Sequence, residues 1–426
     1  MNVLSLFDGM SCGQQALERA GIPIENYFAS EIDKYAIQVT MANYPNTIQL
    51  GSVVGVDASK LPKIDLLIGG SPCQSFSFAG KRKGMSTKDE QEILTLEHYL
   101  QLKSEGFEFE GQSYLFWEYM RLLKEVKPTY FLLENVEMGE KWEKVLSKAI
   151  GVNGIHINSA LVSAQNRQRI YWTNIGMQPG GLFGDLESII TQPKDKGILL
   201  KDILESEVCE KYFLSEKMIA GFERHKERHN DKGTGFGYVP KNGIDKGNSL
   251  RANAALCPTD NMLIVGLTEV RTEEAKQIRR ETGTNPKRAK ELVERTDGKT
   301  GAILTSQTPD NLIKIFNAGE IILKKPNVQI EKTINKNTFY ENEIKGLDFY
   351  NQSKHDKMPT LANPSHGHLG LFSKNIIRRL TPIECERLQT VKDNYTAHVS
   401  DSQRYKMLGN GWTVDIITHI FKYINI

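Results

Sequence analysis

The alternation of apolar runs with amphipathic segments in the first part of the chain constrains the fold more than any other feature of the sequence. Apolar runs typical of buried strands occupy residues 3–7, 26–32, 64–70 and 129–136. Segments with helical periodicity lie between them, and two of these end at Gly21 and Pro128, residue types that commonly terminate helices. Strands that alternate with helices predict an α/β fold with a mostly parallel sheet.

The pattern changes between residues 179 and 371, where glycine, asparagine, lysine and short β-like runs dominate. Residues 268–281 have helical spacing; a solvated helix face is the simpler interpretation and a DNA-reading helix is the alternative. A compact pattern returns in 372–426, which ends in a glycine-rich turn and an apolar helix. We therefore expect an α/β domain in 1–178, an insertion in 179–371 and a segment, 372–426, that returns to the first domain.

Composition places the chain among ordinary globular proteins. It has 426 residues, of which 39% are hydrophobic and 25% charged, and it contains no apolar stretch long enough for a membrane span. The start, MNVLSLFDGM, lacks the pattern of a signal peptide, and five cysteines without a CxxC pair argue against disulfides and zinc. A reducing, cytoplasmic setting is expected. The net charge of +2 neither demands nor excludes a polyanionic partner.

A glycine turn after the first predicted strand indicates a ligand site. In LSLFDGMSCG, Gly9 lets the backbone approach a ligand next to the N–H groups of the following helix. Glu31 ends the second strand about 20 residues later, where an acid binds ribose hydroxyls in dinucleotide folds. Because neither GxGxxG nor a Walker A motif is present, S-adenosylmethionine fits better than a pyrophosphate ligand. The alternative is a structural turn with a surface glutamate.

Three kinds of reactive side chain follow predicted strands. Cys73 comes just after the run 64–70, Glu134 lies near the end of 129–136, and QNRQR places Arg167 and Arg169 two residues apart. Each has a structural alternative: a buried apolar cysteine, an acid at a helix N-terminus, or surface arginines. Together they favour a site, because a structural core does not require reactive groups at consecutive strand ends.

Six motifs occur in a fixed order along the chain: FDGMSCG, SPCQSFSFAG, ENV, QNRQR, RRLTPIECERLQ and LGNGWTV. Together they resemble the ordered motifs of the DNA (cytosine-5)-methyltransferase family, and their spelling is closest to the de novo branch and its phage and bacterial relatives. The resemblance covers about 1–178 and 372–426. It implies a Rossmann-like S-adenosylmethionine-dependent methyltransferase fold, with 179–371 as the family's variable target-recognition domain.

The resemblance also implies an activity. A methyl group would pass from S-adenosylmethionine to carbon 5 of a cytosine flipped out of double-stranded DNA, through a covalent adduct of Cys73 at carbon 6. Glu134 would be the general acid at ring nitrogen 3, Arg167 would stabilise charge near the cytosine oxygen, and Arg169 would hold the loop or the same region. No metal is expected to take part. The implied biological role is restriction–modification or phage self-protection. We expect the protein to be monomeric on DNA and to have a cognate restriction endonuclease as a partner.

The family's binding residues carry over to named positions of this chain. The cofactor would be bound by Phe7, Asp8, Gly9, Glu31, Ile32, Ser52, Pro72, Leu115, Asn410 and Trp412. DNA would be contacted by Gln74, Ser75, Lys81, Arg82 and Lys83. One position departs from the family, which usually has an aspartate at the adenine amine where this chain has Ser52. Serine still accepts a hydrogen bond, so we expect cofactor binding to survive with at most a weaker adenine contact.

Three other functions are disfavoured by the same motifs. A DNA-binding protein without activity is disfavoured because the Cys, Glu and Arg motifs are all present. RNA methylation is disfavoured because the RNA-modifying branch has Cys-Phe-Thr where this chain has Cys73, Gln74 and Ser75. Methylation of an exocyclic amine is disfavoured because those enzymes use a Pro-Pro-aromatic loop without a nucleophilic cysteine.

Overall fold

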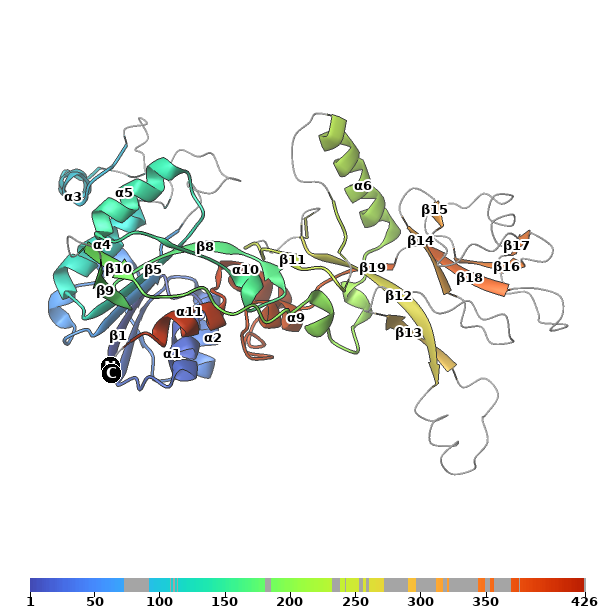
Figure 1. Cartoon of the computed structure of the whole chain (residues 1–426), viewed down its shortest axis with the longest axis horizontal. Helices are drawn as coiled ribbons and strands as arrows, with labels where there is room; N and C mark the ends of the chain where they lie inside the picture. The colour runs from blue at the N-terminus through green and yellow to red at the C-terminus, as the bar shows by residue number, and fades with distance from the viewer. Residues whose placement is uncertain are drawn as a thin grey trace, which may run out of the picture. The chain divides into compact units, whose positions relative to one another are not determined.

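A computed structural model gives the arrangement of the chain (Figure 1). It describes residues 1–72, 92–107, 109, 112, 114–180, 185–231, 238–241, 243–252, 256–257, 260–271, 290–295, 312–316, 320–321, 344–348, 353–355, 369–374 and 376–424. The chain forms two compact units. The sheet unit comprises Met1–Ile198, Gly247–Leu256 and Pro382–Ile426, and the inserted unit comprises Leu199–Lys246 and Cys257–Thr381. The boundaries therefore differ from the expected ones, most clearly because a short piece of the insertion belongs to the sheet unit.

The sheet unit is built on seven strands in the order β3-β2-β1-β4-β5-β8-β6. These are β1 (Asn2–Leu6), β2 (Asn26–Ser30), β3 (Ile48–Gln49), β4 (Leu66–Gly70), β5 (Tyr130–Val136), β6 (Ile155–Asn158) and β8 (Gln168–Thr173). Strands β1 to β5 run parallel to one another, whereas β8 runs antiparallel to β5 and β6. The expected α/β fold with a mostly parallel sheet is confirmed.

The order of the strands reverses at β1, which pairs with β2 on one side and with β4 on the other. Leu6 is in register with both Ser30 and Gly69, so these three strands end together. In open α/β sheets, ligands bind beyond the carboxyl ends of the strands at such a reversal. The turns after β1, β2 and β4 therefore border the place where a ligand site is expected.

Helices cover both faces of this sheet. The described helices of the sheet unit are α1 (Cys12–Ala20), α2 (Lys34–Asn43), α3 (Leu96–Ser104), α4 (Leu115–Val126), α5 (Glu140–Ile150), α9 (Pro382–Leu388), α10 (Asp401–Asn410) and α11 (Val414–Phe421). A Cβ on Gly13 of α1 would meet the Ile68 side chain, and one on Gly69 would meet Tyr119 of α4. Because neighbouring residues of a strand face opposite sides, α1 and α4 lie on opposite faces of β4.

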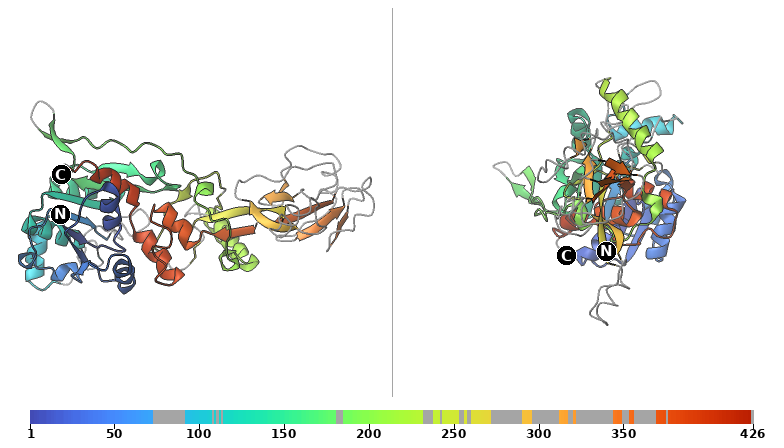
Figure 2. Two further views of the ribbon diagram at one scale, coloured as in Figure 1. Left: turned by 90° about the horizontal axis from the view of Figure 1, so that it is seen from below. Right: turned by 90° about the vertical axis from the view of Figure 1, so that its right-hand side faces the viewer.

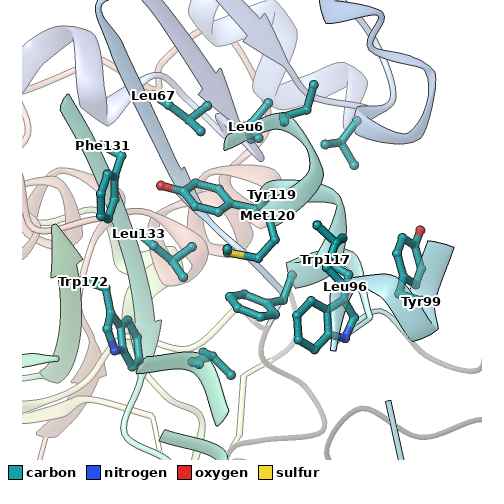
Figure 3. Close-up of a cluster of buried hydrophobic side chains, with 14 of the residues drawn as sticks. Leu6, Leu67, Leu96, Tyr99, Trp117, Tyr119, Met120, Phe131, Leu133 and Trp172 are labelled. Atoms are coloured by element: carbon teal, nitrogen blue, oxygen red, sulfur yellow. The ribbon is translucent and has the colours of Figure 1, made fainter. Parts of the chain in front are cut away.

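The main core lies between α4 and the sheet (Figure 3). The buried face of α4 includes Trp117, Tyr119 and Met120, which pack with Leu67 of β4 and Leu133 of β5. Burial of one large apolar side chain contributes roughly 1.5–3 kcal/mol. The helix stops before Pro128, as the sequence predicts, and its last turn closes on Lys127 in the left-handed conformation.

The C-terminal segment joins the sheet unit from Pro382 onward, ten residues later than expected, and there α11 lies alongside α1 (Figures 1 and 2). Thr418 of α11 donates to the Ala16 carbonyl at 3.5 Å, and Arg19 pairs with Asp415 at 2.7 Å. The remaining strands of this unit are β7 (Gln165–Asn166), β9 (Met177–Gly180), β10 (Asp185–Ser188) and β11 (Gly247–Asn248).

The inserted unit contains α6 (Glu216–Asp231) and two small sheets. One has the order β13-β12-β19 and consists of β12 (Met262–Arg271), β13 (Lys290–Arg295) and β19 (Ile376–Arg379). The other has the order β15-β14-β18-β16-β17 and consists of β14 (Leu312–Phe316), β15 (Glu320–Ile321), β16 (Ile344–Asp348), β17 (Ser353–His355) and β18 (Leu369–Lys374). Among the helices that the structure describes, none is long and apolar enough to cross a membrane.

The helix expected over 268–281 is wrong at its start. Residues 268–271 belong to β12 and pair with β13, and the rest of that segment lies outside the described residues. β-Branched Thr268 and Val270 alternate with charged Glu269 and Arg271, which is a strand pattern of period two.

Candidate active site

The turn after β1 has a strained backbone. Phe7, Gly9 and Ser11 have φ values of 56°, 59° and 57°, in the left-handed region that only glycine adopts readily. The Asp8 N–H donates to the Ser30 carbonyl at 3.2 Å and ties the turn to β2. A Cβ built on Gly9 meets no described atom within 4 Å. Strain of this kind is common at functional sites, and the space in front of the turn can accept a ligand.

Glu31 is oriented by backbone donors at the end of β2. Its Oε2 accepts from the Gly9 N–H at 2.8 Å, and its Oε1 accepts from Ile32 and Asp33 at 2.7 and 2.8 Å. These three bonds leave one of the carboxylate's roughly four acceptor sites open, on Oε2. The neighbouring Ile32 side chain is 71% exposed, a large apolar surface at the same edge. A polar group and an apolar surface are therefore presented together.

Asp8 differs from the expectation that it contacts the cofactor. Its Oδ1 accepts from the Tyr27 hydroxyl at 2.8 Å, and its Oδ2 accepts from the Ser11 hydroxyl. Desolvation around the carboxyl raises the pKa of Asp8 to about 6. The side chain therefore stabilises the turn from behind rather than facing a ligand.

The segment after β3 closes one side of the same edge. The Leu50 N–H donates to Ala29, and the Ser30 hydroxyl donates to the Gly51 carbonyl, both at 2.8 Å. Ser52 follows, exposed, and in the described part of the chain its side chain makes no capping bond to the short 3₁₀ helix Val53–Gly55. Asp57, a conceivable substitute for the usual aspartate, instead accepts from the Ser59 N–H at 3.0 Å in a turn of its own.

Two apolar residues complete this part of the edge. Phe7 after β1 and Leu115 at the start of α4 are each half-buried, and both pack against the main core. Their exposed parts offer flat or branched apolar surface. Such a combination, mostly apolar with a few polar groups, is typical of small-molecule sites.

The end of β4 leads toward Cys73. Ser71 is buried, and its hydroxyl and carbonyl accept from Asn135 Nδ2 at 3.0 and 3.4 Å. Pro72 is the last described residue before the next segment. Cys73 and the expected DNA-contacting residues lie outside the described residues: Gln74, Ser75, Lys81, Arg82 and Lys83. Asn135, next to Glu134, thus fixes the point from which the Cys73 segment departs.

Glu134 and Arg169 form an ion pair at this edge. The distance from Arg169 Nε to Glu134 Oε1 is 2.9 Å, and the two side chains are 14% and 11% exposed. A Cβ on Gly70 would lie 3.1 Å from Glu134 Oε2 and 2.9 Å from Trp412 Nε1. The end of β4, Glu134, Arg169 and the Trp412 ring therefore occupy one small region, in which only glycine fits at position 70.

The chain matches the family model described as C-5 cytosine-specific DNA methylase over residues 1–425. It belongs to the DNA (cytosine-5)-methyltransferase family. The expected family and enzyme class are confirmed, and the family and fold imply S-adenosylmethionine as the methyl donor and DNA as the substrate.

Relatives of this methyltransferase come from phages and bacteria. It is 29% identical to Orphan methyltransferase M.SPRI of Bacillus phage SPR, an alignment that covers 100% of this chain and 98% of that protein. It is 30% identical over 247 residues to Type II methyltransferase M.NlaX of Neisseria lactamica, covering 55% of this chain and 70% of that protein. The solved structure of S. pombe Dnmt2 methyltransferase has a TM-score of 0.51 at 13% identity and covers 99% of this chain and 97% of its own, which shows a shared fold.

The two motif arginines of the methyltransferase have different surroundings. Arg167 is 3% exposed, and its Nη1 donates to Ser249 Oγ and the Leu250 carbonyl, both at 3.1 Å. Its Nη2 donates to the carbonyls of Gly409 and Gly411 at 3.2 and 2.9 Å. These bonds join the 247–252 segment to the C-terminal segment. The geometry does not fit the expected role of Arg167 at the cytosine oxygen, since both terminal nitrogens already bind the protein.

The reason lies in the local strand structure. The sequence suggested that Arg167 and Arg169 share one face of an extended strand. In the structure, β7 ends at Asn166 and β8 begins at Gln168, so Arg167 lies between two strands. The two side chains consequently diverge, one into the protein and one to Glu134.

A second cysteine of the methyltransferase lies close to the returning segment. A Cβ on Gly411 would be 3.5 Å from Cys12 Sγ. Burial raises the pKa of the Cys12 thiol to about 12, so it is protonated at neutral pH and a poor nucleophile. Asn410, at the end of α10, is exposed, and Trp412 is half-buried. In the described part of the chain, no cluster of acidic, histidine or cysteine side chains is placed to bind a metal ion.

The site also contains residues that sequence inspection did not single out. Gly70 is needed for the close approach of Glu134 and Trp412, and Ser30 binds the Gly51 carbonyl. For Gly70, the doubled glycine at the end of IDLLIGG is a visible signal in the sequence. No sequence signal distinguishes Ser30 from any other small polar residue at a strand end.

Proposed function

We propose that this methyltransferase transfers a methyl group from S-adenosylmethionine to carbon 5 of a cytosine flipped out of double-stranded DNA, with Cys73 as the nucleophile. The observation that supports this most is the arrangement of Glu134 and Arg169 against Gly70, three residues before Cys73. A carboxyl and a guanidinium lie at the end of β4, and a thiol follows three residues later in the sequence; these are the groups that such a reaction requires.

The residues around the β1 turn fit the methyl donor. When bound, S-adenosylmethionine would supply an electrophilic methyl group attached to a sulfonium. Glu31 is oriented to accept hydrogen bonds from ribose hydroxyls, and the open space before Gly9 admits the ligand. Phe7, Ile32 and Leu115 offer apolar surface to the adenine and methionine parts. The exposed Ser52 hydroxyl is the candidate partner of the adenine amine.

The protein's part in the chemistry starts with the thiolate of Cys73, which forms a bond to cytosine carbon 6 while Glu134 donates a proton to ring nitrogen 3. Carbon 5 then has enamine character and takes the methyl group. A water molecule takes the carbon 5 proton, the electrons of that bond re-form the ring double bond, and breakage of the carbon–sulfur bond restores the thiolate. The proton on nitrogen 3 returns to Glu134.

Of the two motif arginines, Arg169 is the one that acts at the base in this proposal. It lies 2.9 Å from Glu134, and its guanidinium can stabilise negative charge that develops on the cytosine carbonyl oxygen. It also keeps the carboxylate of Glu134 in place. Arg167 instead supports the scaffold between the 247–252 segment and the C-terminal segment.

DNA recognition is divided between two parts of the chain in this proposal. The Cys73 segment, through Gln74, Ser75, Lys81, Arg82 and Lys83, would contact the DNA around the flipped base. The inserted unit would read the target sequence. The names of the phage and bacterial relatives support a role in phage self-protection or restriction–modification. In this proposal the protein acts as a monomer on DNA, and in restriction–modification it is paired with a cognate endonuclease.

Methylome sequencing tests the proposal. DNA and RNA from cells that express this chain, or its Cys73→Ala variant, are converted with bisulfite and sequenced. The proposal predicts nearly complete cytosine-5 methylation at one short DNA sequence with the wild type and none with the variant. Unmodified DNA from cells with folded, cofactor-binding wild-type protein would contradict it, and so would methylation confined to RNA.

A further inference from the structure

We infer that Arg121 is a positioning residue for the adenine end of the cofactor site and that it acts through the segment that carries Ser52. The inference rests on the proposed function, because it takes Ser52 to contact the adenine. Arg121 lies on α4, and its side chain is 12% exposed. It is not among the residues of the ordered motifs.

One nitrogen of Arg121 holds both ends of a turn. Arg121 Nη2 donates to the carbonyls of Val53 and Val56, each at 3.2 Å. These carbonyls border the 3₁₀ helix Val53–Gly55, which begins immediately after Ser52. The Val53 carbonyl also accepts from the Val56 N–H at 3.3 Å, so Arg121 is its second partner, and a charged donor is a strong one.

The other side of Ser52 is fixed independently. The Ser30 hydroxyl donates to the Gly51 carbonyl at 2.8 Å, and Gly51 has a φ of 73° with no described atom within 4 Å of a Cβ built on it. Ser52 therefore lies between two anchored points and faces open space. Its placement depends on Ser30 before it and, after it, on Arg121 and the buried side chain of Val53.

A buried carboxylate fixes Arg121 in turn. Glu118, one helical turn earlier, is fully buried and accepts from Arg121 Nε at 2.8 Å. Its other oxygen accepts from Tyr99 Oη and Lys103 Nζ, both at 2.5 Å. A buried charge persists only when it is paired and hydrogen-bonded, so this set of donors defines the position of the carboxylate.

The planar guanidinium of Arg121 connects the Glu118 carboxylate to the turn at residues 53–56. Arg121 uses Nε for Glu118, Nη1 for Glu125 at 2.7 Å and Nη2 for the two carbonyls. Because these nitrogens are in one rigid plane, the orientation set by Glu118 also sets the direction of Nη2. The same helix carries Leu115, so α4 links two sides of the proposed adenine pocket.

Some of the hydrogen bonds of Glu118 have a purely structural role. Tyr99 and Lys103 belong to α3, so the bonds of Glu118 to them connect α3 and α4 without reaching the cofactor segment. Among the hydrogen bonds of Glu118 and Arg121 that the structure describes, those of Arg121 Nη2 are the ones that reach residues 53–56. A neutral hydroxyl makes a weaker contact than a carboxylate, and its contribution to binding therefore depends strongly on its placement.

The test compares Arg121→Gln and Arg121→Lys with the wild type. The dissociation constant of S-adenosylmethionine, measured by titration calorimetry, should rise about tenfold in both variants, the size expected for charge-assisted hydrogen bonds. The KM for the cofactor should rise in parallel, while kcat at saturating cofactor and the affinity for DNA stay within about twofold of the wild type. Lysine keeps the charge beside Glu118 but lacks the planar fork, so it should not restore binding.

A double-mutant cycle with Ser52→Ala shows whether Arg121 acts through Ser52. Ser52→Ala should weaken cofactor binding in the wild type and have no further effect in Arg121→Gln. Arg19→Gln, which removes an arginine ion pair with Asp415 between α1 and α11, is the matched control and should leave cofactor affinity unchanged.

Wild-type cofactor affinity in the Arg121 variants, or additive effects of the Arg121 and Ser52 changes, would overturn the inference. If Arg121→Gln does not fold, Arg121→Lys gives the same comparison. Wild-type protein that binds no S-adenosylmethionine would instead contradict the proposed function, and the inference with it.

Discussion

At the scale of single residues, Gly70 shows how closely the groups at the end of β4 are packed. A Cβ at this position would lie 2.9 Å from Trp412 Nε1 and 3.1 Å from Glu134 Oε2. Gly70→Ala should therefore displace Glu134 and lower kcat by about 100-fold, the effect of a misplacement near 1 Å. Tritiated methyl transfer to DNA measures it.

Gly139→Ala is the control for Gly70→Ala. Gly139 precedes α5 with extended backbone angles and no described atom within 4 Å of a Cβ built on it. Its variant should have wild-type activity. Equal activity of the two alanine variants would show that Glu134 tolerates displacement and that its placement does not matter.

Substitutions of the two motif arginines should have different effects, one mainly on stability and the other mainly on activity. Arg167→Gln removes buried charge-assisted hydrogen bonds to four oxygens and should lower the free energy of unfolding by about 3 kcal/mol. Arg169→Gln should lower kcat by about 100-fold with a much smaller loss of stability. Urea unfolding and single-turnover kinetics provide both quantities. A large loss of stability in Arg169→Gln, with the loss of kcat confined to Arg167→Gln, would contradict the two roles.

The raised pKa of Asp8 predicts how the stability of the protein depends on pH. Its pKa is about 6 in the folded protein against 3.8 ordinarily, so the folded state binds the proton more tightly than the unfolded state. Its contribution to stability is therefore fully present below pH 4 and is lost as the pH rises through 6, a difference of about 3 kcal/mol. In Asp8→Asn this decline should be absent, and urea unfolding at pH 4 to 7 compares the two profiles. Parallel profiles would show that the Asp8 carboxyl titrates normally.

Sequence inspection anticipated the position of Glu31 beside the glycine turn, but not the protein contacts that occupy the side chains of Asp8 and Arg167. Glu31 lies at the end of a strand, where its spacing from the glycine turn fixes its surroundings. The direction of a side chain within a turn, as for Asp8, depends on partners such as Tyr27 on another strand. The burial of Arg167 depends on residues 249–250 and 409–411, which are distant in sequence.

At the scale of elements, the contact between α10 and the 247–252 segment gives a further prediction. A Cβ on Gly409 would lie 2.1 Å from the backbone of Arg251. Gly409→Ala should displace that segment and destabilise the protein by about 2 kcal/mol or more. Alanine normally stabilises a helix interior relative to glycine by about 1 kcal/mol. A gain in stability on urea unfolding would therefore contradict the close approach.

Local signals predicted most elements but not all of them. Gly21 and Pro128 mark the ends of α1 and α4 as expected. The sequence analysis did not identify α5, although Glu140 and Glu143 in its first turn and Lys148 in its last complement the helix dipole. The last four residues of β12, 268–271, were mistaken for the start of a helix because charged residues in a period of two can also fit a helical spacing over a few residues.

At the scale of the whole molecule, the division into two units could be anticipated only in outline. The change in composition near residue 180 indicated an insertion. The inclusion of Gly247–Leu256 in the sheet unit depends on a two-residue parallel pairing of β11 with β7 and on the bonds of Arg167. Such long-range contacts have no local sequence signal, so the sequence could not reveal them.

The central claim is a covalent bond between Cys73 and cytosine, and trapping it is the most direct test. DNA that carries 5-fluorocytosine at the methylated position of the recognition sequence has no carbon 5 proton to lose, so the carbon–sulfur bond cannot break after methyl transfer. Wild-type protein with S-adenosylmethionine should give a complex stable to denaturation, with the mass of protein, DNA and one methyl group. Cys209→Ala, which removes an exposed thiol, should give the same complex, and Cys73→Ala none. A wild type that methylates normal DNA but forms no adduct, or an adduct formed by Cys73→Ala, would contradict the claim.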